Sequence, residues 1–342
     1  MNRSTTRGSR GGVLLLAAGA SLATPAVVVA HHPGAIPPEP TAASFLLGWS
    51  FEPAVVAGLA LAAAAWLLQV RRVNAAHPAA PVPRARSIAF LGGLGVIAVA
   101  LLSGIARYDT VLFSVHMMQH VLLMLVAAPL IVLGAPVTLL LRAATGPVRR
   151  RWILPVLHSR IVRVLAHPVV AWVAFAGVGW AAHFSPLFNS ALEDPLLHDL
   201  EHALFLGAAL LFWWPAIGLD PVPWRMSRPV RALYVFLQMP QNTFLGVAIS
   251  FAAAPLYANY AELSAPWLPA ALADQQIAGG IMWLAGDVLF LGAIFGLLVA
   301  WMRAEEHDAV QEDRRADASR AAIREREVRL AERLERERGS PV

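Results

Sequence analysis

The sequence contains no cysteine among its 342 residues. Disulfide bonds, iron–sulfur clusters, thiolate metal sites and thiol nucleophiles are therefore excluded. Charged residues are also scarce, because aspartate, glutamate, lysine and arginine together make up only 14% of the chain. Any metal that this protein binds must take its ligands from histidine, methionine, carboxylates or the backbone.

Hydrophobic residues dominate the composition. They make up 58% of the chain, and the mean hydropathy is +0.59. This composition is typical of a protein that crosses a membrane several times, and not of a soluble globule. The net charge of +5 does not indicate nucleic-acid binding, because the basic residues fall in short loops beside apolar runs, where they set the orientation of a membrane protein.

Seven apolar segments predict seven mature transmembrane helices in one all-α membrane bundle over residues 53–302. The predicted spans cover residues 53–70, 87–106, 111–136, 168–184, 198–217, 232–254 and 276–301. We expect the third span to bend at Pro129 and to end at Gly134–Ala135–Pro136. Residues 303–342 are dense in arginine and glutamate, and predict a charged cytoplasmic helical tail.

Residues 1–30 are typical of a secretory signal, with a basic start, an apolar stretch and a small-residue cleavage site ending at Ala30. The alternative is an uncleaved extra span. Cleavage after Ala30 would leave His31 and His32 at the new N-terminus, where an amine and an imidazole could chelate copper. The Pro-rich residues 31–52 are then expected to form an extracytoplasmic segment.

The basic residues alternate from one side of the predicted bundle to the other. Segments 71–86, 142–167 and 219–231 and the tail carry most of them, whereas segments 107–110, 185–197 and 255–275 carry almost none. Because positive loops stay on the cytoplasmic side, this alternation predicts an N-terminus outside and a C-terminus inside. We therefore expect a multi-pass protein of the cell inner (cytoplasmic) membrane.

The predicted third span carries two histidines in its apolar run. His116 and His120 are four residues apart, so on a helix their rings project from one face and can reach the same metal ion. Polar and ionisable groups inside a span are costly and usually serve a function. A hydrogen-bonded pair that only packs helices together is the structural alternative.

The predicted topology brings three more histidines to the same level. The fourth span exits outside at His183, and the fifth enters from outside with His198 and His202. Five histidines from three helices then share one outer layer, which predicts a metal site. Possible accessory residues are Gln119, Met117, Glu201, Asp274 and Met282, with Asp199 a further candidate to orient the imidazoles.

Copper is the metal that we expect at this site. Imidazole suits zinc, copper, iron and nickel, whereas a thioether favours Cu(I). Methionines occur nearby, although core packing explains most methionines in a span. The methionines in question are Met117, Met118, Met124, Met239 and Met282.

Four motifs resemble the caa3-type CtaG family of cytochrome c oxidase assembly factors. They are HMMQHVLLMLVAAPLIVLGAP at 116–136, WAAHFSPLFNSALEDPLLHDLEHALFL at 180–206, FWWP at 212–215 and DQQIAGGIMW at 274–283. The resemblance covers most of residues 50–302. It implies a seven-span inner-membrane protein that helps to mature a haem–copper oxidase, with a role in copper delivery. The family pattern falls on His116, Gln119, His120, His183, His198, His202 and Asp274, with Met282 and Trp283 beside it.

The expected function is therefore that of a membrane assembly factor without catalytic residues, which binds copper at the outer cluster and delivers it. Its partners would be an oxidase subunit or other assembly factors and membrane lipid, and not nucleic acid. A competing function is that of a zinc hydrolase, because HDLEH at 198–202 fits H-x-x-E-H with Glu201 as general base and a distant acidic ligand such as Asp274 or Asp287. A bis-His haem b protein and a transporter are two further candidate functions.

Overall fold

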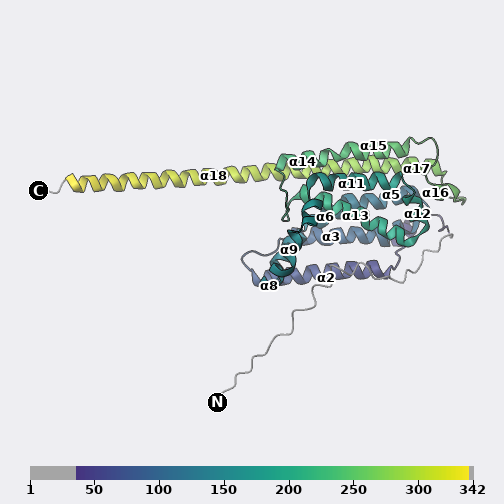
Figure 1. Cartoon of the computed structure of the whole chain (residues 1–342), viewed down its shortest axis with the longest axis horizontal. Helices are drawn as coiled ribbons and strands as arrows, with labels where there is room; N and C mark the ends of the chain where they lie inside the picture. The colour runs from purple at the N-terminus through teal and green to yellow at the C-terminus, as the bar shows by residue number, and fades with distance from the viewer. Residues whose placement is uncertain (1–35, 339–342) are drawn as a thin grey trace, which may run out of the picture.

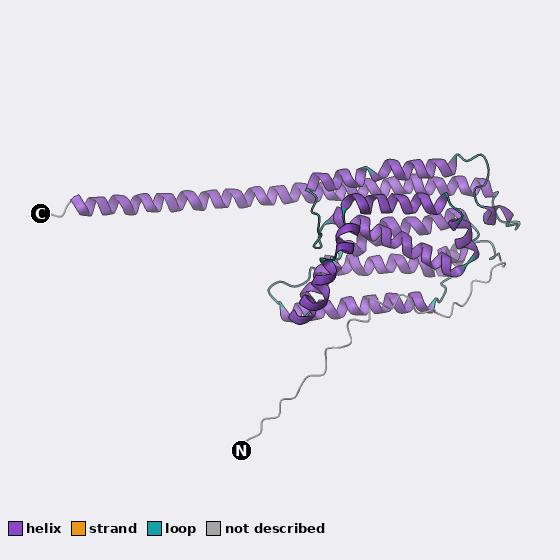
Figure 2. Cartoon of the chain, viewed as in Figure 1, coloured by secondary structure: helices purple, strands orange, loops and turns teal. Residues whose placement is uncertain are grey.

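The computed structural model describes residues 36–338 as a set of helices joined by loops (Figure 1). No strand occurs in these residues, which confirms the predicted all-α fold (Figure 2). The long helices lie side by side in one bundle, and α18 (Gly286–Arg338) leaves the bundle at one end. The predicted signal segment and the His31–His32 pair lie outside the described residues.

Five helical segments of the described chain are long and apolar enough to cross a membrane. They are Pro53–Ala76 (α2), Arg84–Tyr108 (α3, Arg84–Leu102, with α4, Gly104–Tyr108), Phe113–Ala143, Pro195–Ile217 (α13) and Ala271–Ala331. A sixth crossing is possible if α11 (Pro168–His183) and α12 (Leu187–Glu193), which are bent by 68° relative to each other, form one span. The chain is therefore a multi-pass membrane protein.

The predicted sixth span, residues 232–254, consists of two shorter helices. They are α14 (Arg228–Phe236) and α15 (Gln238–Ser250), and each is shorter than a membrane span requires. The polar residues that lower the hydropathy of α15 include Gln238, Gln241 and Asn242, whose side chains line a pocket inside the bundle. The total of seven spans thus stays a prediction.

The third predicted span departs from α-helical geometry where it was expected to bend. It comprises α5 (Phe113–Val121), the π-helical turn η2 (Leu122–Ala127) and α6 (Ala128–Leu133). The Ala128 N–H donates to the carbonyl of Leu123, five residues earlier. The carbonyl of Met124 would need the N–H of residue 129 in the same pattern, and proline has none.

Trp213 on α13 supplies the donor that Pro129 lacks. Its indole N–H donates to the Met124 carbonyl at 2.9 Å, and its side chain is 2% exposed. An unsatisfied carbonyl would be costly at this depth. The hydrogen bond therefore ties α13 to the third span at its irregular turn, close to the histidines on α5.

The helix of the third predicted span breaks where the sequence predicted its end, although the membrane-length segment continues to Ala143. Ala135 adopts a left-handed φ of 57°, and α7 (Pro136–Ala143) begins directly after it. The Asp220 carboxylate, from the loop after α13, accepts the backbone N–H groups of Val137 at 3.1 Å and Thr138 at 2.6 Å. A carboxylate at a helix N-terminus satisfies these donors and interacts favourably with the helix dipole.

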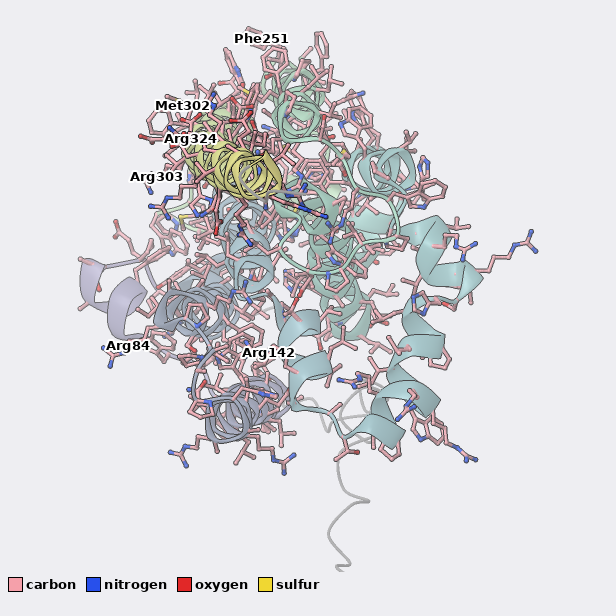
Figure 3. All side chains as sticks on the ribbon, turned by 90° about the vertical axis from the view of Figure 1, so that its left-hand side faces the viewer. Arg84, Arg142, Phe251, Met302, Arg303 and Arg324 are labelled. Atoms are coloured by element: carbon pink, nitrogen blue, oxygen red, sulfur yellow. The ribbon has the colours of Figure 1, made fainter. Side chains whose placement is uncertain are left out.

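The two ends of the bundle differ in charge and in the short elements that cover them. The basic segment forms α8 (Gly146–Val148), η3 (Arg149–Ile153), α9 (Leu154–Leu157) and α10 (Arg160–Leu165) at the end from which α18 leaves. Arg84, Arg142 and Arg303 are among the side chains at this end (Figure 3). The opposite end carries α1 (Ala42–Leu47), α12, α16 (Ala258–Glu262) and the start of α17 (Ala271–Gly280), which η4 (Ile281–Ala285) joins to α18.

We expect Trp213→Phe to destabilise the protein because it leaves the Met124 carbonyl without a donor. A buried carbonyl that loses its partner costs about 1–3 kcal/mol. Thermal unfolding of the detergent-purified protein measures the change. Trp214→Phe is the matched control, since the Trp214 indole N–H has no hydrogen-bond partner among the described residues. Equal stability losses in the two variants would contradict this role.

Candidate metal centre

Five histidines from three helices meet at the end of the bundle opposite the tail. His116 and His120 lie on α5, His183 ends α11, and His198 and His202 lie in the first turns of α13. Ring centroids of neighbouring pairs are between 4.4 and 6.3 Å apart. The convergence expected from the topology is thus present, whereas metal binding itself stays a prediction.

Local contacts fix the helix ends that carry these histidines. The Asp194 side chain caps α13 by accepting the N–H groups of Leu196 at 2.8 Å and Leu197 at 3.2 Å, and Pro195 occupies the first position. The Asp274 carboxylate accepts from the backbone N–H and the hydroxyl of Ser114 in the first turn of α5. Because Asp274 lies on α17, this contact holds the start of α5 against α17.

The imidazoles are almost fully buried. His116 is 0% exposed, His120 is 4% and His202 is 8%, while the His198 side chain is 13% exposed and is the nearest to solvent. Phe188 of α12 is itself fully buried, and its ring lies 5.0 Å from that of His116. The cluster is therefore covered by α12 on its outer side, with His198 at the edge of this cover.

Hydrogen bonds to Tyr260 fix the tautomer of His116. The Tyr260 hydroxyl lies 2.6 Å from the Asp109 carbonyl oxygen and 3.3 Å from His116 Nδ1. Burial raises the pKa of Tyr260 well above its usual value, so the hydroxyl stays protonated. A carbonyl only accepts, so Tyr260 donates to Asp109 and accepts from His116 Nδ1–H. His116 therefore presents the lone pair of Nε2 to the cluster.

Gln119 fixes His202 in the same manner. Gln119 Nε2 donates to the carbonyl of Ala100 on α3 at 2.9 Å, which leaves its Oε1 to accept from His202 Nε2 at 2.9 Å. His202 then carries its lone pair on Nδ1. A hydrogen bond that orients a ring and fixes its tautomer is the usual partner of a metal-binding imidazole.

Several buried polar atoms in the cluster lack partners. His120 Nε2 lies 3.0 Å from His116 Nε2, but His120 Nδ1 makes no hydrogen bond within the described chain. Neither carboxylate oxygen of Glu201 makes one, although Oε2 lies 3.8 Å from His116 Nε2. Such orphaned atoms are rare and costly, most of all at membrane depth. A cation between these atoms would satisfy several of them at once.

Two groups of side chains have the spacing of a metal site. Three ligand atoms lie within 4.8 Å of one another in each group. The groups are His116 with His198 and His202, and His116 with His120 and Glu201. Three protein ligands leave a position open for a further ligand or for exchange.

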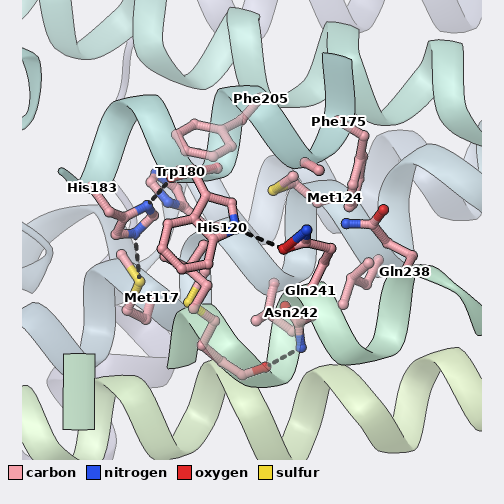
Figure 4. A pocket seen from close by; sticks show the side chains of 16 residues that line it. Met117, His120, Met124, Phe175, Trp180, His183, Phe205, Gln238, Gln241 and Asn242 are labelled. Atoms are coloured by element: carbon pink, nitrogen blue, oxygen red, sulfur yellow. Dashed lines mark hydrogen bonds between the residues drawn. The ribbon is translucent and has the colours of Figure 1, made fainter. Parts of the chain in front are cut away.

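His183 belongs to neither of these groups. Its Nδ1 lies 2.7 Å from the Gly179 carbonyl oxygen, and its Nε2 lies 3.4 Å from Met117 Sδ (Figure 4). The ring is 6.3 Å from that of His120, measured between centroids. It borders a pocket between α11, α15 and the third span instead.

A family model matches the part of the chain that forms this site. The model of the cytochrome c oxidase caa3 assembly factor, Caa3_CtaG, matches residues 64–304. The chain belongs to the Caa3_CtaG family. The match confirms the resemblance drawn from the motifs, and it contains all five histidines of the cluster.

Curated relatives extend beyond the part that this chain matches. Uncharacterized proteins of Mycobacterium bovis and Mycobacterium tuberculosis are each 34% identical over 296 residues, which is 84% of this chain and 44% of the relative. One of Mycobacterium leprae is 32% identical over 298 residues, with the same coverage. The chain thus spans less than half the length of these relatives. No solved structure matches it.

The structure gives the predicted accessory residues different places. Gln119 orients His202, and Glu201 lies among the candidate ligands themselves. Asp274 caps α5 and belongs to neither metal group, while Met282 lines the pocket beside His183. Asp199, by contrast, is exposed on α13.

Sequence reasoning missed Asp109 and Tyr260. Asp109 lies in the loop before α5, is 3% exposed, and its Oδ2 is 3.9 Å from His198 Nε2. Burial raises the pKa of Asp109 to about 7, and hydrogen bonds lower it in part. Both residues lie between the predicted spans, in segments that carry almost no basic charge, and only their burial identifies them.

We expect Tyr260→Phe to weaken metal binding by about 10- to 100-fold, because His116 Nδ1 loses the oxygen that holds its proton. Metal competition titration of the purified protein measures this change. Tyr257→Phe is the matched control, since the Tyr257 hydroxyl bonds the His183 carbonyl at 3.2 Å and packs in the same hydrophobic cluster. Equal affinities for wild type and Tyr260→Phe would contradict the tautomer assignment.

Proposed function

We propose that this protein holds copper in its outer histidine cluster during assembly of a haem–copper oxidase and passes the metal to an oxidase subunit. The family supplies the oxidase-assembly role. The observation that carries the copper role is the grouping of buried ligand atoms of His116, His120 and Glu201 within 4.8 Å of one another. His120 Nδ1 and both carboxylate oxygens of Glu201 have no hydrogen-bond partner among the described residues. Copper is the cargo in this proposal.

The donor set supports copper over other metals. Imidazoles dominate it, a thioether lies beside it, and thiolates are absent from the sequence. Hard cations such as Mg²⁺ and Ca²⁺ require mostly oxygen ligands, and Glu201 is the one carboxylate in either group. The residues therefore fit a borderline or soft metal.

The position of the cluster supports exchange with a partner in the membrane. The cluster lies at the end of the bundle opposite the arginine-rich elements. The positive-inside rule assigns this arginine-poor end to the outside. His198 is the least buried ligand of the cluster, so a partner would meet this side chain first. An oxidase subunit or another assembly factor is the expected partner, and lipid surrounds the bundle.

A zinc hydrolase is a second candidate that one observation favours. The third ligand for HDLEH would then be His116, which groups with His198 and His202, in place of the acidic residue expected from the sequence. Glu201 would then be the general base. Glu201→Gln separates the two functions. If Glu201 is a copper ligand, the substitution weakens metal binding. If Glu201 is the general base of a hydrolase, the metal stays bound and hydrolysis is lost.

The geometry disfavours a bis-His haem centre. The rings that would have to face each other across a haem lie close together, with centroids 5.3 Å apart for His116 and His198 and 5.7 Å apart for His120 and His202. Phe188 and Phe205 pack directly against the same rings. A porphyrin has no space between such rings. Absence of a Soret band from the purified protein is the expected result.

Metal analysis of the purified protein tests the copper proposal. We expect wild type, purified with a tag that contains no histidine and loaded with copper, to retain it stoichiometrically, and His116→Ala/His120→Ala to lose it. His77→Ala/His158→Ala is the control, because it removes two histidines outside the cluster. Stoichiometric copper in the His116/His120 variant would overturn the proposal.

The assembly role has a separate test in cells. We expect membranes that lack this protein to have less oxidase activity and less copper in the oxidase. The wild-type gene and the His77→Ala/His158→Ala variant should restore both, and His116→Ala/His120→Ala should not. Restoration by the His116/His120 variant would separate assembly from the cluster.

A further inference from the structure

The contact between His183 and Met117 joins two atoms that both carry lone pairs. The Gly179 carbonyl oxygen, 2.7 Å from His183 Nδ1, only accepts, so Nδ1 carries the proton of the neutral ring. His183 Nε2 then has a lone pair, and it lies 3.4 Å from Met117 Sδ, which has no proton to donate. An imidazole and a thioether therefore point toward one place without a hydrogen bond between them.

The neutral ring is the state that this environment favours. A second proton would convert the contact to a weak N–H to sulfur hydrogen bond. It would also place a positive charge on a ring that is 3% exposed and 6.3 Å from that of His120. The cost of burying such a charge without a counter-ion exceeds the energy of a weak hydrogen bond.

A small pocket of about 40 Å³ adjoins this contact (Figure 4). Met117, His120 and His183 line it together with two further methionines, Met124 and Met282. Trp180 of α11 donates to Gln241 Oε1 of α15 at 3.0 Å on another side of the pocket. Space, thioethers and imidazoles thus occur together at this point inside the bundle.

This place differs chemically from the two groups of candidate ligands in the cluster. Those groups contain only imidazoles and the Glu201 carboxylate, and His183 is in neither of them. His120 belongs to both regions, because it joins His116 and Glu201 in one group and lines the pocket with His183. His120 is therefore the residue that the two places share.

We propose that Met117 and His183 form a second metal position that is selective for Cu(I), next to the imidazole cluster. The inference rests on the proposed copper function and deepens it. Cu(I) prefers soft ligands, whereas divalent ions favour imidazole and carboxylate. Two uncharged ligands also keep the total charge at +1 in a site of low dielectric constant. The imidazole cluster with Glu201 suits a divalent ion, and the Met117–His183 position suits the monovalent one.

Copper K-edge absorption spectroscopy of the Cu(I)-loaded protein tests this position. We expect a sulfur neighbour of copper in the wild type. Met117→Leu conserves side-chain volume, so it should fold. It should lose the sulfur neighbour. It should also bind Cu(I) at least about tenfold more weakly, because changes to the groups around a metal commonly lower its affinity by this much. Binding of Zn²⁺, which reports on the imidazole cluster, should stay within about twofold, because a remote contact should change it little.

Met118→Leu is the matched control on the same helix. Met118 packs against the cluster around Ile105 and Tyr108, away from the pocket. We expect Met118→Leu to retain both the sulfur neighbour and the Cu(I) affinity of wild type. A second variant, His183→Gln, should weaken Cu(I) binding as Met117→Leu does.

Three results would overturn the inference, and they differ in what they imply for the copper function. If copper in the Cu(I)-loaded wild type has only nitrogen and oxygen neighbours, the Met117–His183 position does not hold it, whether or not any variant folds. A sulfur neighbour that survives Met117→Leu leads to the same conclusion. In both cases copper that is lost in His116→Ala/His120→Ala leaves the proposed function standing. No copper in wild type overturns both.

Discussion

In each of three imidazoles of the bundle, one ring nitrogen donates a hydrogen bond to a surrounding group, and the other nitrogen carries a lone pair. His116 bonds Tyr260, His202 bonds Gln119, and His183 bonds the Gly179 carbonyl. These hydrogen bonds determine which nitrogen carries the proton. Since these rings are buried, their remaining lone pairs face other buried groups of the bundle. The helix caps and aromatic contacts around the cluster hold this arrangement in place.

Periodicity and charge predicted the elements and the meeting of the histidines. The i, i+4 spacing of His116 and His120 fixed one helix face, and the alternation of basic loops placed His183 and His198 at the same end. The same reasoning could not find Tyr260 or Asp109, because residues between the spans reach a site through tertiary folding, which periodicity does not describe. Nor could hydropathy separate α14 from α15, where inward-facing amides interrupt an apolar run.

The part of the chain that matches the family model contains the whole site. Residues 64–304 match that model and include Asp109, Tyr260 and both candidate ligand groups. The irregular turn at Pro129, with its hydrogen bond from Trp213, lies in the same region. The turn and the site depend on contacts between the third span and α13, so packing of these two helices decides both stability and site geometry.

The long final helix has a mechanical consequence. α18 continues from the bundle to Arg338 as one helix, with pairs such as Arg320–Asp317 and Arg329–Glu325 along its shaft. Residues 303–338 project about 54 Å at the ordinary rise of an α-helix. Because the shaft and the intramembrane part are one rod, any rotation or tilt of the buried half swings the far tip. A small tilt of the bundle therefore produces a large displacement of the tip.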